Sequence, residues 1–218
     1  MAGEAEGICD KGGQMLLLLN QMAKNTVMNM VFDLDGTLVD TREANYLAYR
    51  EAFARHNLEL SREIYERSFG KKWEEWGPEI ARERASQIHD AKIESFGNYI
   101  PLVKPIEIYV HILKSSFGSH RTVLATSASR KCTRMILDHF DLRFSDEFYG
   151  EDYPDKRSML VEIKKNVMAR LKDTLLIDDN QDNIKLADEL GFRTHLAVSG
   201  GRGMLRVQKV RPRKTSQG

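Results

Sequence analysis

The sequence predicts an α/β fold, in which a Rossmann-like parallel sheet core carries helices on both faces and an inserted all-helical cap domain. Expected strands alternate with expected helices along most of the chain, which is the pattern of a parallel sheet. Each expected strand is a nearly continuous apolar run, which is typical of strands covered on both faces. A long segment after the first strand shows only helical periodicity. We therefore assign residues 26–41 and 105–198 to the core and residues 42–104 to the cap.

The core begins with the stretch TVMNMVFDLD, residues 26–35, which is apolar and β-branched enough to form a strand cut off by Gly36. After the cap, we expect Pro105 to open a helix that runs to about Ser116, because proline suits the first helical turn. The rest of the core alternates, with strands predicted at 121–126, 146–150, 174–178 and 193–198 and helices at 129–140, at about 155–170 and at DNIKLADELG, with Gly191 as the residue that ends it.

The cap segment has the periodicity of several helices. The first is expected to start after Thr41 as its N-cap, and further helices are expected around 61–69, 78–90 and 91–98, with Gly70 and Gly77-Pro78 as breaks. The stretch FGKKWEEW, residues 69–76, lies at one of these breaks. Its residues Lys71, Lys72 and Trp73 could contact the substrate. Alternatively, the lysines are solvated and the tryptophans belong to the core of the cap.

Composition narrows the class of protein. The chain has 218 residues, 41% hydrophobic and 30% charged, which is typical of a globular protein with a sizeable core. With 33 basic and 32 acidic residues, it has no general attraction for nucleic acid or membranes, and two cysteines without a disulfide or metal pattern favour the cytoplasm. Residues 1–25 are an undetermined extension whose apolar run MLLLL is too short to span a bilayer. From Ser199 to Gly218 there are six basic residues and no acid, and we expect a flexible tail rather than a nucleic-acid site.

Chemically active residues follow four of the expected strands. Asp33 and Asp35 are two positions apart, so in a strand they would point to the same face. Because the carboxyl ends of parallel strands meet at one edge, these groups should converge with those of the other strands: Thr126 and Ser127, Lys156, and Asp178 with Asp179. Four converging acids require a counter-charge, and Mg²⁺ with its oxygen ligands fits. A lysine beside the metal would suit a phosphoryl group.

These motifs resemble the haloacid dehalogenase superfamily of aspartate-nucleophile phosphotransferases. The resemblance covers residues 28–198 and rests on DLDGT at 33–37, a Ser/Thr after the second core strand, a lysine leading the next helix, and the DD pair before a helix. The stretch FDLDGTLVDT followed by a helical insert is similar to the phosphoglycolate phosphatase and β-phosphoglucomutase branch.

The resemblance implies a role for each motif residue. Asp33 would be the nucleophile that forms an aspartyl-phosphate, and Asp35 would be the general acid and base. The phosphate would be bound by Ser127 or Thr126, Lys156, Gly36 and Thr37, and Mg²⁺ by Asp33, the backbone carbonyl of Asp35, Asp179 and Asp178. Taken singly, several of these residues have ordinary explanations, such as helix capping by Asp155, Asp178 or Asn180.

The combined pattern predicts a Mg²⁺-dependent phosphatase that hydrolyses a small phosphomonoester. A phosphomutase with the same aspartyl-phosphate is the nearest alternative, and a non-catalytic protein that binds a phosphorylated ligand is another. A dehalogenase is disfavoured, because that chemistry needs no second acid and Asp35 supplies one.

Overall fold

The computed structural model describes residues 29–69, 71–167 and 174–198. A five-stranded parallel sheet forms its centre, in the order β5-β4-β1-β6-β7. The strands are β1 (Asn29–Phe32), β4 (Arg121–Thr126), β5 (Asp146–Tyr149), β6 (Thr174–Asp178) and β7 (Arg193–Leu196). The expected extension at 1–25 and the basic tail from 199 to 218 lie outside the described residues.

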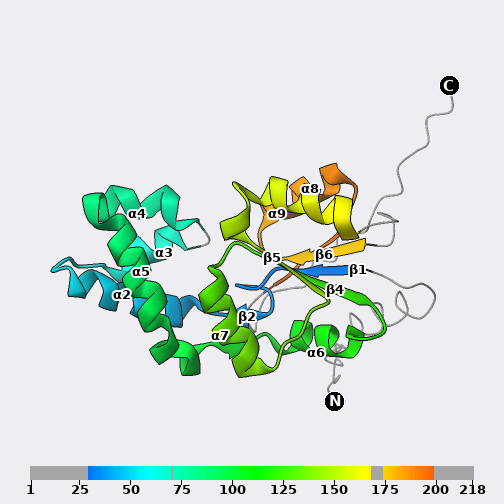
Figure 1. Ribbon diagram of the computed structural model, residues 1–218, viewed down its shortest axis with the longest axis horizontal. Helices are drawn as coiled ribbons and strands as arrows, with labels where there is room; N and C mark the ends of the chain where they lie inside the picture. Colours follow the sequence, from blue (N-terminus) through cyan, green and yellow to red (C-terminus); the bar gives the residue numbers. More distant parts are fainter. Residues whose placement is uncertain (1–28, 70, 168–173, 199–218) are drawn as a thin grey trace, which may run out of the picture.

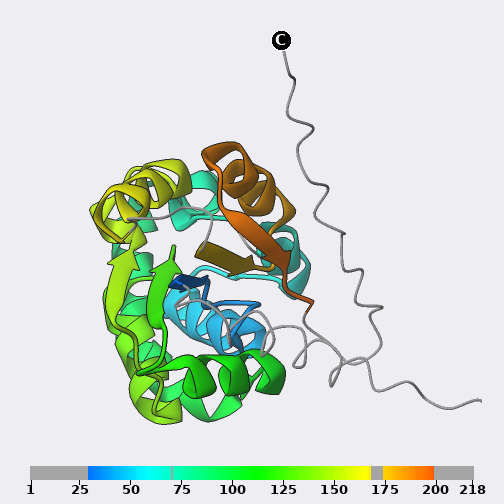
Figure 2. The same cartoon turned by 90° about the vertical axis from the view of Figure 1, so that its right-hand side faces the viewer.

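Helices cover both faces of the sheet (Figure 1). They are α6 (Glu107–Ser116) and α7 (Arg130–Phe140) on one face, and α8 (Lys156–Val167) and α9 (Gln181–Leu190) on the other. Neighbouring residues of a strand point to opposite faces, so Phe32 packs in the core beside α6 and α7 whereas Val31 packs with Leu160 of α8. Figure 2, turned by 90°, shows the strands between these helix pairs. The predicted α/β fold is confirmed.

Between β1 and α6 the chain forms a block of helices, called here the helical insert (residues 42–102). It contains α2 (Arg42–Arg55), α3 (Arg62–Ser68), α4 (Trp73–Ala81) and α5 (Ala85–Ser95), with short 3₁₀ helices η1 (Arg82–Arg84) and η2 (Phe96–Leu102). The insert lies beside the sheet, at the left in Figure 1. It has its own hydrophobic core, in which Tyr49, Phe53 and Trp73 pack together. The insertion is therefore a compact unit.

The Gly77-Pro78 pair is inside α4, so the prediction that it breaks a helix was wrong. The helix starts earlier than expected, at Trp73. A Cβ atom on residue 77 would lie 2.3 Å from the Trp73 ring, so only glycine leaves room for that ring along the helix. The loss of one backbone donor at Pro78 is tolerated because Trp73 and Trp76 hold the helix in the core of the insert.

The two chain connections between insert and sheet run side by side. They are β2 (Val39–Asp40) and β3 (Lys104–Pro105), which pair antiparallel with Val39 opposite Pro105. Pro105 therefore belongs to a strand pair and does not open a helix, which corrects the expectation. The backbone N–H of Ile106 donates to the carbonyl of Leu38 at 2.8 Å and extends this pairing, and α6 begins only at Glu107.

The helices expected at 78–90 and 91–98 are not separated there, because α5 runs from Ala85 to Ser95 across the expected boundary. The ends of the core elements agree with expectation within a few residues. Gly191 ends α9 in the left-handed conformation at φ +91°, as predicted. Asn180 is the N-cap of that helix, and its side chain accepts from the backbone N–H groups of Asp182 and Asn183. None of the helices in the described residues is both long and apolar enough for a membrane span.

Candidate active site

Lys156 and Asp33 form a buried ion pair at the carboxyl end of the sheet. Lys156 Nζ donates to Asp33 Oδ1 at 2.8 Å and to the backbone carbonyl of Ala125 at 2.7 Å, and it lies 3.2 Å from Asp178 Oδ2. Burial alone would lower the pKa of Lys156, but Asp33 and Asp178 outweigh it and raise that pKa above its usual value. The lysine is thus a fixed positive charge between two carboxylates.

Three carboxylates meet beside this lysine. Oxygen atoms of Asp33, Asp178 and Asp179 all lie within 4.8 Å of one another. Burial, opposed by Lys156 and reinforced by Asp178, raises the pKa of Asp33 well above its usual value. Burial and then Asp178 raise the pKa of Asp179 to about 6. Such crowding of negative charge is relieved by a bound divalent cation with oxygen ligands.

Asp178 is held by a second set of donors. It is fully buried at the end of β6, and Asn183 Nδ2 donates to its two oxygens at 3.1 and 3.0 Å. The backbone N–H of Asn180 donates to Asp178 Oδ1 at 2.9 Å. These donors fix the rotamer of Asp178 and stabilise its charge, so its orientation in the cluster is set before any ligand arrives.

The two aspartates of DLDGT lie in the turn after β1, and not within the strand where the sequence analysis placed them. β1 ends at Phe32, so Asp33 and Asp35 follow the strand, and the argument that they share one strand face was wrong. The chain turns at Gly36, which has φ +83° and whose N–H donates to the carbonyl of Val39 at 2.8 Å. Asp35 is not one of the three clustered carboxylates, although its charge contributes to the raised pKa of Asp179.

The side chain of Asp35 is hydrogen-bonded instead to the segment that starts the helical insert. Thr41 Oγ1 donates to Asp35 Oδ1, and Asn45 Nδ2 donates to Thr41 Oγ1 at 2.9 Å. Thr41 occupies the N-cap position of α2 as expected, but its hydroxyl makes no capping bond. Burial raises the pKa of Asp35, and the Thr41 hydroxyl opposes this rise. A carboxyl with a raised pKa is suited to proton transfer.

The hydroxyl groups expected to bind phosphate have different surroundings. Thr126 is buried at the end of β4, and its Oγ1 accepts from the backbone N–H of Ala128 at 3.0 Å, which leaves its own proton to donate. Ser127 is exposed. Thr37 Oγ1 is buried without a hydrogen-bond partner among the described residues. The choice between Thr126 and Ser127 stays a prediction.

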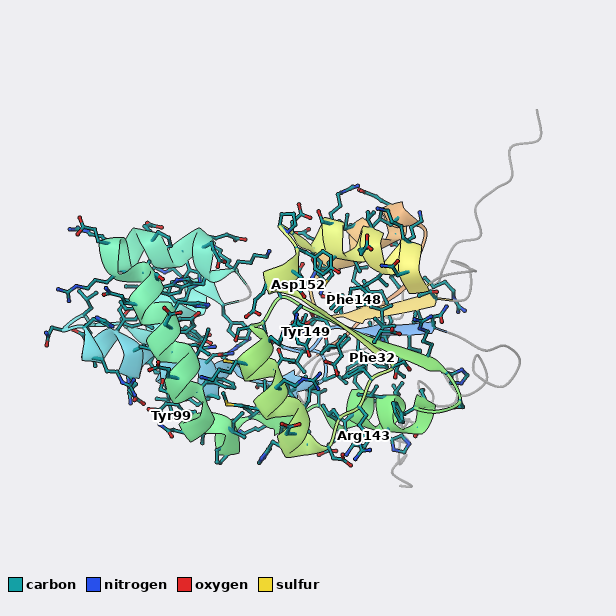
Figure 3. All side chains as sticks on the ribbon, in the orientation of Figure 1. Phe32, Tyr99, Arg143, Phe148, Tyr149 and Asp152 are labelled. Carbon is teal, nitrogen blue, oxygen red and sulfur yellow. The ribbon has the colours of Figure 1, made fainter. Side chains whose placement is uncertain are left out.

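The loop after β5 closes the same end of the sheet, where Figure 3 labels Tyr149 and Asp152 near the insert. A Cβ on Gly150 would lie 2.9 Å from the Cα and carbonyl oxygen of Ser127, so this glycine allows the two loops to approach.

Asp155, just before Lys156, accepts from the backbone N–H of Ser158 at 2.7 Å and so caps α8.

The three insert residues expected near substrate are separated in the structure. Lys72 Nζ donates to the backbone carbonyl of Pro154 at 3.0 Å and so connects the insert to the segment that leads into Lys156. Lys71 is exposed. Trp73 is buried in the core of the insert, where its ring stacks on that of Tyr49 with centroids 5.0 Å apart.

One charged residue of this region was missed by the sequence analysis. Lys92 of α5 is buried, and its charge lowers the pKa of Asp35, although less than burial raises it. Its burial could have been predicted from its position in the helix. Lys92 lies on the same helix face as Ile88, Ala91 and Ser95, where apolar or small residues are usual.

Comparison with known proteins identifies the family. A model of haloacid dehalogenase-like hydrolases matches residues 30–197. The chain belongs to this family. The resemblance predicted from DLDGT and the other motifs is confirmed, and the protein is an enzyme of the hydrolase class. No curated protein matches the chain.

Solved structures are similar to this haloacid dehalogenase-like hydrolase at low identity. CbbY of Rhodobacter sphaeroides, solved in complex with phosphate, is 18% identical with a TM-score of 0.68, over 84% of this chain and 92% of that one. A Lactobacillus plantarum protein described as a candidate phosphoglycolate phosphatase is 17% identical with a TM-score of 0.67, over 79% and 86%. The hydrolase YfnB of Bacillus subtilis, bound to magnesium and showing interdomain movement, is 18% identical with a TM-score of 0.63, over 79% and 89%. These likenesses establish the shared fold.

Proposed function

We propose that this hydrolase is a Mg²⁺-dependent phosphatase that cleaves a small phosphomonoester through an aspartyl-phosphate on Asp33. The observation that supports it most is the contact of Lys156 with both Asp33 and Asp178, beside a cluster of three carboxylates. A lysine in this place can bind a phosphoryl oxygen, and a carboxylate beside it can attack the phosphorus.

The residues present fit a magnesium ion. Asp33, Asp178 and Asp179 supply oxygen ligands within 4.8 Å of one another, and the backbone carbonyl of Asp35 is proposed as a further ligand. When bound, Mg²⁺ lowers the charge repulsion between the carboxylates and the phosphate and stabilises the charge that develops in phosphoryl transfer. Asn183 keeps Asp178 oriented for this role.

In the first half of the reaction, a carboxylate oxygen of Asp33 forms a bond to phosphorus while the ester P–O bond breaks. Lys156 holds Asp33 Oδ1 and thereby fixes the side chain for attack. Asp35 gives its proton to the leaving oxygen, since its raised pKa favours the protonated form. In the second half, Asp35 removes a proton from water, the water oxygen attacks phosphorus, and Asp33 leaves as a carboxylate.

The phosphate would be bound by groups from several loops: the backbone after Asp33 with Gly36 and Thr37, the hydroxyl of Thr126 or Ser127, and Lys156. Thr37 supports this assignment, since its buried hydroxyl has no partner among the described residues and can serve a ligand.

The helical insert would act as a cap that excludes water and selects the leaving group. We propose a cap of residues 42–104 on a core of 26–41 and 105–198. For its Lys71, Lys72 and Trp73 the sequence left two alternatives, contact with substrate or solvated lysines with the tryptophan in the cap core. The bond of Lys72 to Pro154 supports a role for that lysine at the site entrance, and the burial of Trp73 favours packing inside the cap.

The first experiment is release of inorganic phosphate from a panel of phosphate esters, including phosphoglycolate, sugar phosphates and nucleotides, with and without Mg²⁺. Release should require Mg²⁺ and should vanish in Asp33→Asn, which removes the nucleophile but keeps the side-chain shape. Acid quenching during turnover should trap phosphate on wild-type protein and not on Asp33→Asn.

Other outcomes would favour the alternatives. Phosphate release that survives in Asp33→Asn would contradict the assigned nucleophile. A trapped phosphoenzyme without phosphate release, together with conversion of β-glucose 1-phosphate to its 6-phosphate isomer, would indicate a phosphomutase. Binding of phosphate esters without any turnover would indicate a non-catalytic binding protein.

A further inference from the structure

A buried lysine and a buried cysteine meet where the helical insert packs on the sheet region. Lys92 of α5 is 7% exposed and Cys132 of α7 is 2% exposed. Lys92 Nζ donates to Cys132 Sγ at 3.7 Å. The contact therefore joins a side chain of the insert to a side chain of a helix that covers the sheet.

The surroundings of Lys92 do not explain its burial as part of an ion pair. Within the described residues, no carboxylate lies within ion-pair distance of its ammonium group, and the other close groups are the rings of Tyr49 and Phe96, with centroids 5.2 and 4.7 Å away. A buried ammonium without a carboxylate is costly, and ring faces offset only part of that cost. The amine thus has the sulfur as its hydrogen-bond partner, while its charge acts on Asp35 from beyond ion-pair distance.

Cys132 lies near the N-terminus of α7 and is covered in this arrangement. It is in the first turn of α7, where its backbone N–H donates to the N-cap hydroxyl of Ser129 at 3.3 Å. Oxidation of a cysteine sulfur by a peroxide gives a sulfenic acid. A sulfenic acid formed there would have the amine of Lys92 in direct contact.

We propose that Lys92 and Cys132 form a reversible sulfenamide bond when a peroxide oxidises the protein. The peroxide converts the Cys132 thiol to a sulfenic acid and leaves as water. Lys92 Nζ gives one proton to water and then attacks the sulfenic sulfur. The S–N bond forms, the S–O bond breaks, and the hydroxyl takes a second amine proton and leaves as water. The sulfur loses two electrons and the peroxide gains them.

This bond would lock the helical insert onto the sheet region. Both side chains are covered in the present arrangement, so peroxide would reach the sulfur when the insert separates from α7, and closure would then bring the amine to the oxidised sulfur. A thiol reductant that attacks the sulfur would restore the free amine and thiol.

The test uses full-length Cys9→Ser protein, in which Cys132 is the sole cysteine. After treatment with hydrogen peroxide and digestion, mass spectrometry should find the Lys92 and Cys132 peptides joined with a loss of two hydrogens. Dithiothreitol should release them. Lys92→Arg keeps a positive charge but has a poor nucleophile, so it should give no joined peptide, and Cys132→Ser should give none either.

The cross-link is read by mass and does not depend on enzyme activity, so a failure of the proposed phosphatase function leaves this test intact. Sulfinic or sulfonic acid on Cys132 with Lys92 unmodified would overturn the proposal. The same conclusion follows if Cys132 stays reduced in wild-type protein under peroxide concentrations that fully oxidise Cys9. If phosphate release is established, it should fall as the cross-link forms and return with dithiothreitol.

Discussion

Gly36 and Asp179 are in such close contact that a single added carbon would make them overlap. A Cβ on residue 36 would lie 2.1 Å from Asp179 Oδ2. Gly36 follows the first sheet strand and Asp179 follows β6, so the glycine of DLDGT makes room for a carboxylate of the DD pair. The two motifs therefore depend on each other through space, in addition to their separate chemistry.

Gly36→Ala should therefore abolish most activity. Its backbone strain at φ +83° costs about 1–2 kcal/mol, and the Cβ displaces the Asp179 carboxylate as well. A misplacement of about 1 Å within an active site costs roughly 10²-fold in rate. Phosphate release and Mg²⁺ affinity should be measured for this variant and for the control Gly191→Ala. Residue 191 has a φ of +91° and so brings the same strain, but no atom lies within 4 Å of the added Cβ. Equal losses of activity in the two variants would contradict the proposed contact.

Asn183→Ala should weaken magnesium activation without abolishing phosphate release at saturating metal. The substitution removes the amide that donates to Asp178 at 3.1 and 3.0 Å, and loss of such a supporting partner lowers metal affinity roughly 10–100-fold. The Mg²⁺ concentration for half-maximal activity is the measurement. Gln181→Ala, an exposed position in the same helical turn, should leave it unchanged.

Thr41→Val should shift the pH dependence of kcat/KM. The Thr41 hydroxyl stabilises the ionised form of Asp35, so its removal raises the pKa of Asp35 further. The limb that reports Asp35 should move to higher pH by about one to two units, because a hydrogen bond to a charged group contributes about 1.5–3 kcal/mol. Thr41→Ser keeps the hydroxyl and should restore the wild-type profile. Identical profiles for the two variants would show that the hydroxyl has no such role.

Lys72→Ala should change kinetics more than Lys71→Ala does. Lys72 donates to the carbonyl of Pro154 across the boundary between insert and sheet region, whereas Lys71 is exposed. An exposed contact of this kind contributes about 0–1 kcal/mol, so we expect KM to rise at most about fivefold. Equal effects of both substitutions would indicate a general effect of positive charge instead of this contact.

Protein stability should decrease in acid because of His195. Its Nε2 lies 3.1 Å from the hydroxyl of buried Tyr109, and burial lowers its pKa from 6.5 to about 4. Between these values the unfolded chain binds a proton that the folded protein does not, so stability falls as pH decreases through this window, by at most about 1.4 kcal/mol per unit. Urea unfolding of wild type and His195→Gln across the window should show a smaller pH slope in the variant.

The sequence predicted the sheet and its helices well because each of these elements carries a clear apolar pattern. The strand at β6 and the helix end at Gly191 were predicted from local composition alone. The site motifs were also recognisable, since Asp33, Lys156 and Asp178 follow strands that a parallel sheet must bring to one edge.

Features that depend on side-chain packing and on the path of the backbone in space were not predictable from composition and periodicity. Thr41 was assigned as a cap, and its bond to Asp35 follows from the turn at Gly36. The Gly77-Pro78 pair has the composition of a break, but packing around Trp73 keeps it helical. The pairing of Val39 with Pro105 joins two short segments, neither of which has enough residues to show a strand pattern.

The antiparallel pairing of β2 and β3 also bears on the ancestry of the enzyme. Because Val39 faces Pro105, the chain leaves for the helical insert and returns from it at neighbouring points. A segment whose two ends lie this close can be lengthened, replaced or lost without moving the strands on either side of it. Substrate preference in this lineage could therefore change by exchange of one contiguous stretch of the gene, while the carboxylates and the lysine stayed where they were.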